Sequence, residues 1–356
     1  MRLVMALFIV FYHTAWVNGN TVFDFPKAGY LAVDFFFIVS GYMIIRSCRD
    51  NEKKGTEPGT LRYCFHKLMS FLPYLIIAEI IFGVVNGFAA TDPSYAFEKN
   101  FDKFMGGMWY QLQNILCLSM LNIYRGDVSW YLSALILSTL ILYPIIRRSK
   151  VIFPRYVAPV LGVLMIIVVL AVTGAINSPN HTTFGFISKG LLVGVATMSL
   201  GIFAYELVDI MKNHRFKNDT IVYTVIEIVS FLIVSIFMIT GNPWGRDTRE
   251  FFEFMIITFI FIGTTVTLST MSLTTEWVSK SSFLCDNAKW FAVGSLLIYL
   301  THCIVTTGLN AGAPDMPYVA RLFLVIFIAL ILSVIVYILG NRLRIWMLQE
   351  LKKSLS

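Results

Sequence analysis

The chain has 356 residues, of which 57% are hydrophobic and only 14% are charged, and its formal net charge is +7. About a quarter of the residues of a soluble domain are charged, so this composition excludes a soluble globular protein. The positive charge does not indicate a nucleic-acid partner, because membrane proteins concentrate Lys and Arg in their cytoplasmic loops. We therefore expect a multi-pass protein of the lipid bilayer with no nucleic acid among its partners.

Long apolar runs recur from one end of the chain to the other, separated by polar or Pro- and Gly-bearing stretches. Several of them reach the length of about 18 residues that a helix needs to cross the hydrocarbon core. The expected fold is an all-α polytopic membrane protein, with a single transmembrane domain over residues 1–341 and a short basic cytoplasmic tail over residues 342–356. The predicted helices, ten in number, lie near residues 2–17, 28–46, 70–90, 128–146, 156–175, 187–208, 220–240, 251–273, 288–307 and 318–341.

The first apolar run is short, with about 15 apolar residues from Leu3 onward, against the roughly 20 that a spanning helix needs. No convincing small-residue cleavage site follows it, so we expect a retained helix rather than a signal peptide. Its shortness predicts that a few upstream residues are missing from the start of this chain.

The distribution of Lys and Arg predicts the orientation. With the N-terminus inside, 20 of these residues lie in inner segments and 8 in outer ones. Cytoplasmic segments of membrane proteins carry such an excess. An even number of helices then places both termini in the cytoplasm.

The longest connection between predicted helices covers residues 91–127. Within it, residues 108–121 are amphipathic, which predicts a segment that lies in the membrane interface or re-enters the membrane. The five cysteines are spaced unlike metal ligands, and their odd number argues against a full disulfide framework. We therefore expect no metal site and no tightly bound cofactor.

Ionisable residues inside apolar helices are costly, so each is a candidate for function. Away from the helix ends these are His13, Asp34, Glu79, Glu227 and His302. For Glu79 and Glu227 the pattern does not distinguish a structural partner from a site residue. Small residues, namely Ser40, Gly41, Gly190 and Gly194, are expected to let helices pack closely.

Arg2 and His13 lie on one face of the first helix, because eleven residues at 100° each make three turns plus about 20°. One face therefore presents a cation at the inner end and an imidazole about 16 Å deeper. Asp34, on the second helix, is expected at a depth similar to that of His13. A carboxylate there would fix the imidazole tautomer and raise its basicity. The competing interpretation is structural: a snorkelling Arg and a polar pair that closes the helical hairpin.

His302 lies in the outer half of the ninth predicted helix, and a structural role is again the alternative. Cys303 follows it but is expected to point about 100° away. A Cys–His nucleophilic pair is therefore not expected.

At these residues the sequence resembles the acyltransferase 3 family of membrane acyltransferases. That family carries Arg or Lys, ten residues and then His in its first helix, as Arg2 and His13 do here. Its second-helix motif matches residues 32–41, with Ala32 in place of the usual Gly. Residues 128–133, which include Trp130, resemble its Trp-x-Leu-Ser segment, and residues 295–302 resemble its late Ser-x-x-x-Tyr-Leu-x-His helix. The resemblance covers the whole chain and implies ten helices.

The sequence departs from the family pattern at two places. Ala134 and Leu135 stand where many members have a Glu after the Trp-x-Leu-Ser motif. Lys67 and Ser70 precede Pro73 where many members have two Arg. Longer members of the family have an extracytoplasmic hydrolase-like domain after the last helix. We expect none in this chain.

The resemblance implies transfer of an acyl group, with acetyl expected, from cytoplasmic acyl-CoA to a hydroxyl of a surface or exported polysaccharide, in the plasma membrane of a bacterium. His13, assisted by Asp34, would be the general base on the acceptor or would carry the acyl group, two alternatives that the sequence leaves open. Residues expected to bind substrate, the CoA phosphates above all, are Arg2, Arg62, His66, Lys67, Trp130 and His302.

Two other functions compete with acyl transfer. Intramembrane His and Asp also serve proton relays, so the main alternative is a proton-coupled transporter or exporter of a glycan-related substrate. An inverted repeat would favour a transporter, and we find none. A non-catalytic partner in a glycan-export complex has no positive feature in the sequence.

Overall fold

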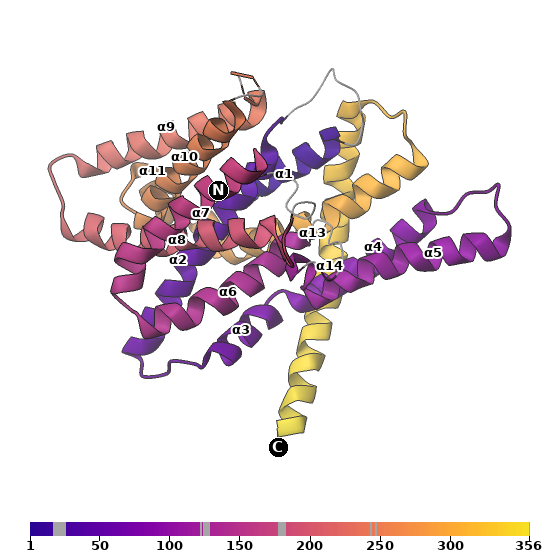
Figure 1. The fold of residues 1–356 in the computed structure, drawn as a ribbon, viewed down its shortest axis with the longest axis horizontal. Helices are drawn as coiled ribbons and strands as arrows, with labels where there is room; N and C mark the ends of the chain where they lie inside the picture. Colours follow the sequence, from indigo (N-terminus) through magenta and orange to yellow (C-terminus); the bar gives the residue numbers. More distant parts are fainter. Residues whose placement is uncertain are drawn as a thin grey trace.

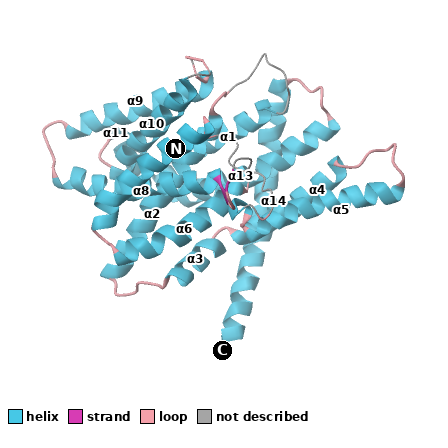
Figure 2. Ribbon diagram, viewed as in Figure 1, coloured by secondary structure: helices cyan, strands magenta, loops and turns pink. Residues whose placement is uncertain are grey.

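The computed structural model describes residues 1–16, 26–121, 123, 129–176, 183–242, 244–245 and 248–355. Helices make up nearly all of this part of the chain (Figures 1 and 2). The α-helices are α1 (Arg2–Trp16), α2 (Ala32–Lys53), α3 (Thr60–Met69), α4 (Leu72–Ala89), α5 (Phe97–Leu112), α6 (Trp130–Arg148), α7 (Ala158–Thr173), α8 (Lys189–Asn213), α9 (Asp219–Thr240), α10 (Arg249–Ser269), α11 (Leu273–Lys280), α12 (Ser282–Asp286), α13 (Ala288–Gly312) and α14 (Tyr318–Leu355).

Short 3-10 turns and a small hairpin complete the described chain. The turns are η2 (Gly29–Leu31), η3 (Gln113–Leu116) and η4 (Ser119–Leu121), and a π-helical turn, η5 (Phe153–Val157), opens α7. Strands β1 (Thr183–Phe184) and β2 (Ile187–Ser188) pair in antiparallel fashion just before α8.

Nine helices of the described chain are long and apolar enough to cross a membrane, and α1 is a tenth, shorter apolar helix. Each overlaps one of the predicted spans, so the prediction of an all-α polytopic membrane protein is confirmed. Two helices run beyond their predicted ends, α2 to Lys53 and α14 to Leu355. The end of α14 projects from the bundle (Figure 1).

The centre of the bundle is the pair α2 and α8, whose spanning windows are 72% and 78% buried, against 22% for α14. Small residues allow this close approach. A Cβ on Gly41 would lie 2.0 Å from the Met198 carbonyl oxygen, and one on Gly201 would lie 2.0 Å from that of Ile38. The expected packing role of Gly41 is therefore confirmed, with the partner backbone now identified.

The long connection after α4 returns into the bundle. Helix α5 runs back alongside α4 as a helical hairpin (Figure 1), and the turns that follow it bury Cys117 and Met120. Ser133 of α6 donates a 2.8 Å hydrogen bond to the Cys117 carbonyl and accepts one from the Met120 amide. We call residues 113–121 the re-entrant segment because they return into the bundle; whether they lie in the membrane interface or within the membrane stays a prediction.

The orientation stays a prediction. Reporter fusions at Lys150 and Lys217 should read cytoplasmic, and fusions at Asn180, which lies outside the described residues, and Gly245 should read external, because the Lys and Arg excess lies on the side of the first pair. Activity of a periplasmic reporter such as alkaline phosphatase checks this. A reversed reading at any two of these positions would rule out the proposed topology.

Candidate active site

Helices α1 and α13 pack against each other and bring two histidines together. The imidazole centroids of His13 and His302 lie 5.2 Å apart. His302 is fully buried and His13 is half-buried. Two residues that the sequence places 289 positions apart thus form one polar site inside an apolar bundle.

The tautomer of His302 follows from its hydrogen bonds. Its Nδ1 lies 3.2 Å from the carbonyl oxygen of Ile298, which can only accept, so Nδ1 carries the proton of the neutral ring. Its Nε2 then carries a lone pair and can accept a hydrogen bond. The Cys303 thiol, with its sulfur 3.2 Å away, is the donor. The expectation that Cys303 points away from His302 was wrong. The 100° step fixes only the Cα–Cβ directions, and the side-chain torsions turn Nε2 and the sulfur toward each other.

Asp34 is buried on α2, five residues of chain after the point where this segment touches α1. That point is Gly29, since a Cβ there would lie 2.6 Å from the Phe8 carbonyl oxygen and 2.8 Å from Tyr12 Cβ. Among the described residues, the ring of α13 that lies against His13 is that of His302. The expected match in depth between Asp34 and His13 stays a prediction.

A cavity of about 200 Å³, which we call the central cavity, lies between the N-terminal end of α1 and the helices around it. Arg2 and Lys67 supply its cations. Five hydroxyl residues also line it, namely Ser40, Ser70, Tyr131, Ser295 and Tyr299. Such a cavity, lined by two cations, hydroxyls and apolar groups, suits an anionic molecule with an uncharged arm.

The two cations of the cavity are without acidic partners in the described chain, whereas several other cations of the described chain are paired with acids. Glu206 pairs with Arg49 at 3.2 Å and with Arg155 at 3.1 Å. Lys150 likewise pairs with Glu52, and Arg147 with Glu57. Arg2 and Lys67 are therefore available to an anionic ligand.

Burial of Lys67 lowers its pKa to about 8, and the charge of Arg2 lowers it further in the same direction. The two cations therefore repel each other across the cavity. Arg62 and His66, predicted with Lys67 as a basic patch, lie on the exposed side of α3 and do not line the cavity. Their part in binding stays a prediction, and the structure separates them from Arg2.

Aromatic contacts connect the central cavity to the two histidines. Tyr131 and Tyr299 line the cavity with ring centroids 5.7 Å apart, and the Tyr299 ring is 5.9 Å from that of His302. The same helix, α13, thus carries the cavity wall at Ser295 and Tyr299 and the histidine one turn further on.

The segment around Trp130 contributes in a different way from the one expected. The Trp130 ring packs 6.0 Å from that of Phe37 and does not line the cavity, whereas its neighbour Tyr131 does. Ser133 fixes the re-entrant turn, as described above. The substrate-binding role assigned to Trp130 stays a prediction, and Tyr131 is the cavity residue that the sequence analysis did not single out.

The two undecided acids have polar partners of their own. Glu79 accepts a hydrogen bond from the Asn114 amide at 3.3 Å, so it holds the re-entrant segment against α4. Glu227 accepts hydrogen bonds from the hydroxyls of Thr267 and Thr274, which tie α9 to α10 and α11. Both therefore have structural partners.

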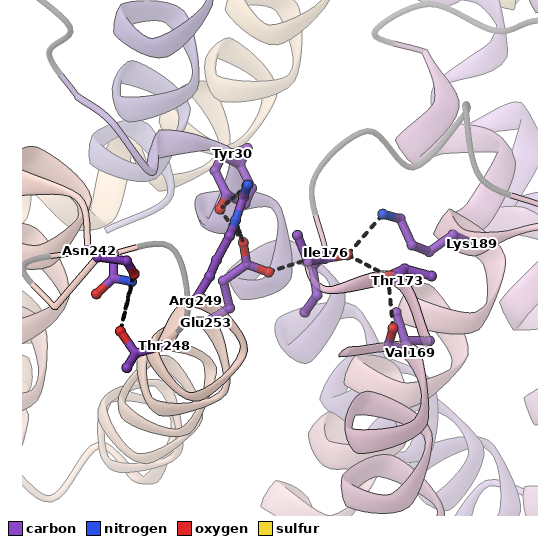
Figure 3. Close-up of polar contacts among 11 residues, drawn as sticks. Tyr30, Val169, Thr173, Ile176, Lys189, Asn242, Thr248, Arg249 and Glu253 are labelled. Carbon is purple, nitrogen blue, oxygen red and sulfur yellow. Dashed lines mark hydrogen bonds and ion pairs between the residues drawn. The ribbon is translucent and has the colours of Figure 1, made fainter. Parts of the chain in front are cut away.

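A second polar cluster, which the sequence analysis missed, lies near the N-terminal ends of α2, α8 and α10 (Figure 3). Its centre is Glu253, a fully buried carboxylate on α10. It is hydrogen-bonded by the Tyr30 hydroxyl and the Ile176 amide and paired with Arg249 at 3.0 Å. Nearby, Lys189 donates to the Ala175 carbonyl at 2.8 Å. The signal was present in the i, i+4 spacing of Arg249 and Glu253.

This cluster adjoins the histidines through aromatic rings. The ring centroids of Tyr12 and Tyr30 are 5.3 Å apart, and the Tyr12 ring meets that of its neighbour His13 edge-on. Arg249 donates a hydrogen bond to the Tyr30 hydroxyl and stays 38% exposed, so a polar group arriving at this end of the bundle can reach it. The histidines thus lie between the central cavity and this cluster.

Comparison with known proteins gives one result. The model of the acyltransferase 3 family, described as an acyltransferase domain, matches residues 1–338. No curated protein and no solved structure matches the chain. The match covers the histidines, the central cavity and nearly the whole bundle, and the chain therefore belongs to the acyltransferase 3 family and is a multi-pass membrane acyltransferase.

Proposed function

We propose that this protein transfers an acyl group, acetyl in the first instance, from acyl-CoA to a hydroxyl of a surface or exported polysaccharide. The observation that carries the proposal is the position of the two histidines between the cationic central cavity and the polar cluster around Glu253. A donor and an acceptor that arrive from opposite sides would meet there. The membrane-spanning helices and the proposed polysaccharide acceptor favour a location in the plasma membrane. In this proposal acyl-CoA is a substrate rather than a resident cofactor.

The donor end of the proposal rests on Arg2 and Lys67. Phosphate oxygens of CoA would accept charge-assisted hydrogen bonds from both side chains. The pantetheine arm would extend along Ser40, Ser295 and Tyr131, which line the cavity as hydrogen-bond partners for its amides. The thioester would then lie near Tyr299, beside the histidines.

The chemical step needs a base for the acceptor hydroxyl. His13 would remove its proton as the oxygen attacks the thioester carbonyl, and the CoA thiolate would leave and take up a proton. The imidazolium formed is a buried cation, which Asp34 would stabilise through its charge rather than through a hydrogen bond. The acceptor would enter past Tyr12, Tyr30 and Arg249.

Lys67 tests the donor end. Lys67→Gln should raise the apparent KM for acetyl-CoA about tenfold or more, the effect of losing ~1.4 kcal/mol of binding, with a smaller change in kcat. Arg62→Gln is the comparison, because Arg62 lies on the same helix but outside the cavity; its KM should rise less than that of Lys67→Gln. Equal effects of the two substitutions would move the donor site away from the central cavity.

The low pKa of Lys67 predicts a pH dependence. Below about pH 8 the ammonium is charged and holds phosphate, and above it the charge is lost, so the KM for acetyl-CoA should rise from pH 7 to pH 9. Lys67→Arg keeps its charge over this range and should flatten the rise. A rise of equal size in both proteins would assign the titration to another group.

The function as a whole is tested in cells and with pure protein. Mass analysis of surface glycans from cells with and without the protein should reveal an acyl group that depends on its presence. Purified protein should release free CoA from acetyl-CoA only when a hydroxyl acceptor is added. Export of unmodified glycan that depends on the protein, without acyl transfer, would refute the proposal.

A further inference from the structure

We propose that His13, His302 and Cys303 form a Zn²⁺ site that, when occupied, blocks acyl transfer. One ligand atom from each residue lies within 4.8 Å of the other two. Among the residues that the structure describes, these three are the group of His, Cys, Asp or Glu side chains that meets this condition. The cysteine spacing alone does not indicate such a site, because two of the ligands are histidines from helices at opposite ends of the chain.

The donor set suits zinc. Imidazole nitrogen and thiolate sulfur are the ligands that Zn²⁺ prefers, and carboxylate or carbonyl oxygens would favour Mg²⁺ or Ca²⁺ instead. In tetrahedral zinc sites with bonds of 2.0–2.3 Å, ligand atoms lie about 3.4 Å from one another. His302 Nε2 and Cys303 Sγ are 3.2 Å apart already. The ring nitrogen of His13 needs to move about 1 Å closer to the other two ligand atoms, a shift that rotation of its side chain can supply.

The surroundings of His302 prepare it as a ligand. Metal-bound histidines donate their second ring N–H to a carbonyl or carboxylate, which fixes the tautomer and the ring plane. His302 has this arrangement, since Nδ1 faces the Ile298 carbonyl and leaves Nε2 as a lone pair beside the thiol. On binding, Zn²⁺ takes both imidazole lone pairs, and the Cys303 thiol loses its proton to solvent.

Three protein ligands leave the fourth position of a tetrahedral ion open for water. The half-buried side chain of His13 leaves the cluster accessible from one side. The site would therefore exchange its metal with solution, unlike a closed structural site with four protein ligands.

Inhibition follows from the lone pair of His13, and this part rests on the proposed function. An imidazole nitrogen bound to Zn²⁺ cannot accept the proton of the acceptor hydroxyl. Zinc should therefore abolish transfer without displacing acetyl-CoA, because the cations of the donor end are not ligands. Loss of the thiolate ligand should raise the Zn²⁺ concentration for half-inhibition at least tenfold.

The test uses the purified full chain in detergent, with reduced thiols and bound metal removed. Co²⁺, a spectroscopic substitute for Zn²⁺, should produce a thiolate-to-cobalt charge-transfer band that Zn²⁺ abolishes by displacement. The band should be lost in Cys303→Ala and reduced in His302→Gln, and it should persist in Cys285→Ser, whose cysteine is exposed on α12. If the cobalt spectrum of Cys303→Ala is identical to that of the unmodified protein, the bound metal is adventitious metal only, and the proposed site is refuted.

Transfer assays with Zn²⁺ then separate the two claims. Inhibition that is weakened in Cys303→Ala, measured against the metal-free activity of that variant, supports the whole proposal. A cysteine-dependent cobalt band with no inhibition by Zn²⁺ would keep the metal site and overturn the role of His13 as base. His302→Gln serves as a second variant should Cys303→Ala fail to run as a single species in size-exclusion chromatography.

Discussion

Replacing His13 with alanine should abolish measurable acyl transfer while the protein still inserts and binds acetyl-CoA. A general base contributes about 10²- to 10⁴-fold in rate, so the loss appears in kcat. Donor binding should survive because the proposed phosphate contacts come from Arg2 and Lys67, which line the central cavity, whereas His13 does not line it. Turnover with saturating acetyl-CoA and binding of a non-transferable CoA analogue measure the two quantities separately.

Asp34→Asn provides the comparison for this result. It keeps the shape of the side chain and removes its charge, and we expect kcat to fall by about tenfold, or ~1.4 kcal/mol. If Asp34 acts only through the imidazolium of His13, the double variant His13→Ala/Asp34→Asn should be scarcely worse than His13→Ala. Near-normal turnover of a well-folded His13→Ala protein would remove the catalytic role and leave this histidine a structural residue.

Replacing Gly41 with alanine should cause a large loss of stability. Its new Cβ would lie 2.0 Å from the carbonyl oxygen of Met198 and 2.8 Å from the carbonyl carbon, and both belong to the backbone of α8. Neither atom can rotate away, so the central helix pair must separate, at a cost of about 1–3 kcal/mol or more. The yield of monodisperse protein and its apparent Tm measure the effect.

Gly294→Ala is the matched control for Gly41→Ala. Gly294 also lies within a spanning helix, α13, but a Cβ there would meet no atom within 4 Å. Helix propensity alone then applies, and alanine should leave the Tm unchanged or raise it, by up to ~1 kcal/mol of stability. An equal loss in both variants would mean that the close contact of α2 and α8 does not limit stability.

The sequence by itself determined the membrane-spanning architecture. Apolar runs long enough to cross a bilayer can be recognised without knowledge of their neighbours, because each helix satisfies its own backbone hydrogen bonds. For the same reason the local motifs around Arg2, His13 and Ser40 were sufficient to indicate the family, which the match over residues 1–338 then established. The i, i+11 relation of Arg2 and His13 is likewise a property of one helix.

Only the tertiary structure decided which side chains meet. Helix periodicity states on which face a residue lies but not the axial offset between two helices, so it could not show that Gly29 is the residue that abuts Phe8 and Tyr12 of α1. It also could not pair His13 with His302, or turn Cys303 toward the imidazole, since these depend on packing and side-chain torsions. The separation of Lys67 from Arg62 arises in the same way, because the cavity is formed by residues from several helices whose packing is fixed only in the folded bundle.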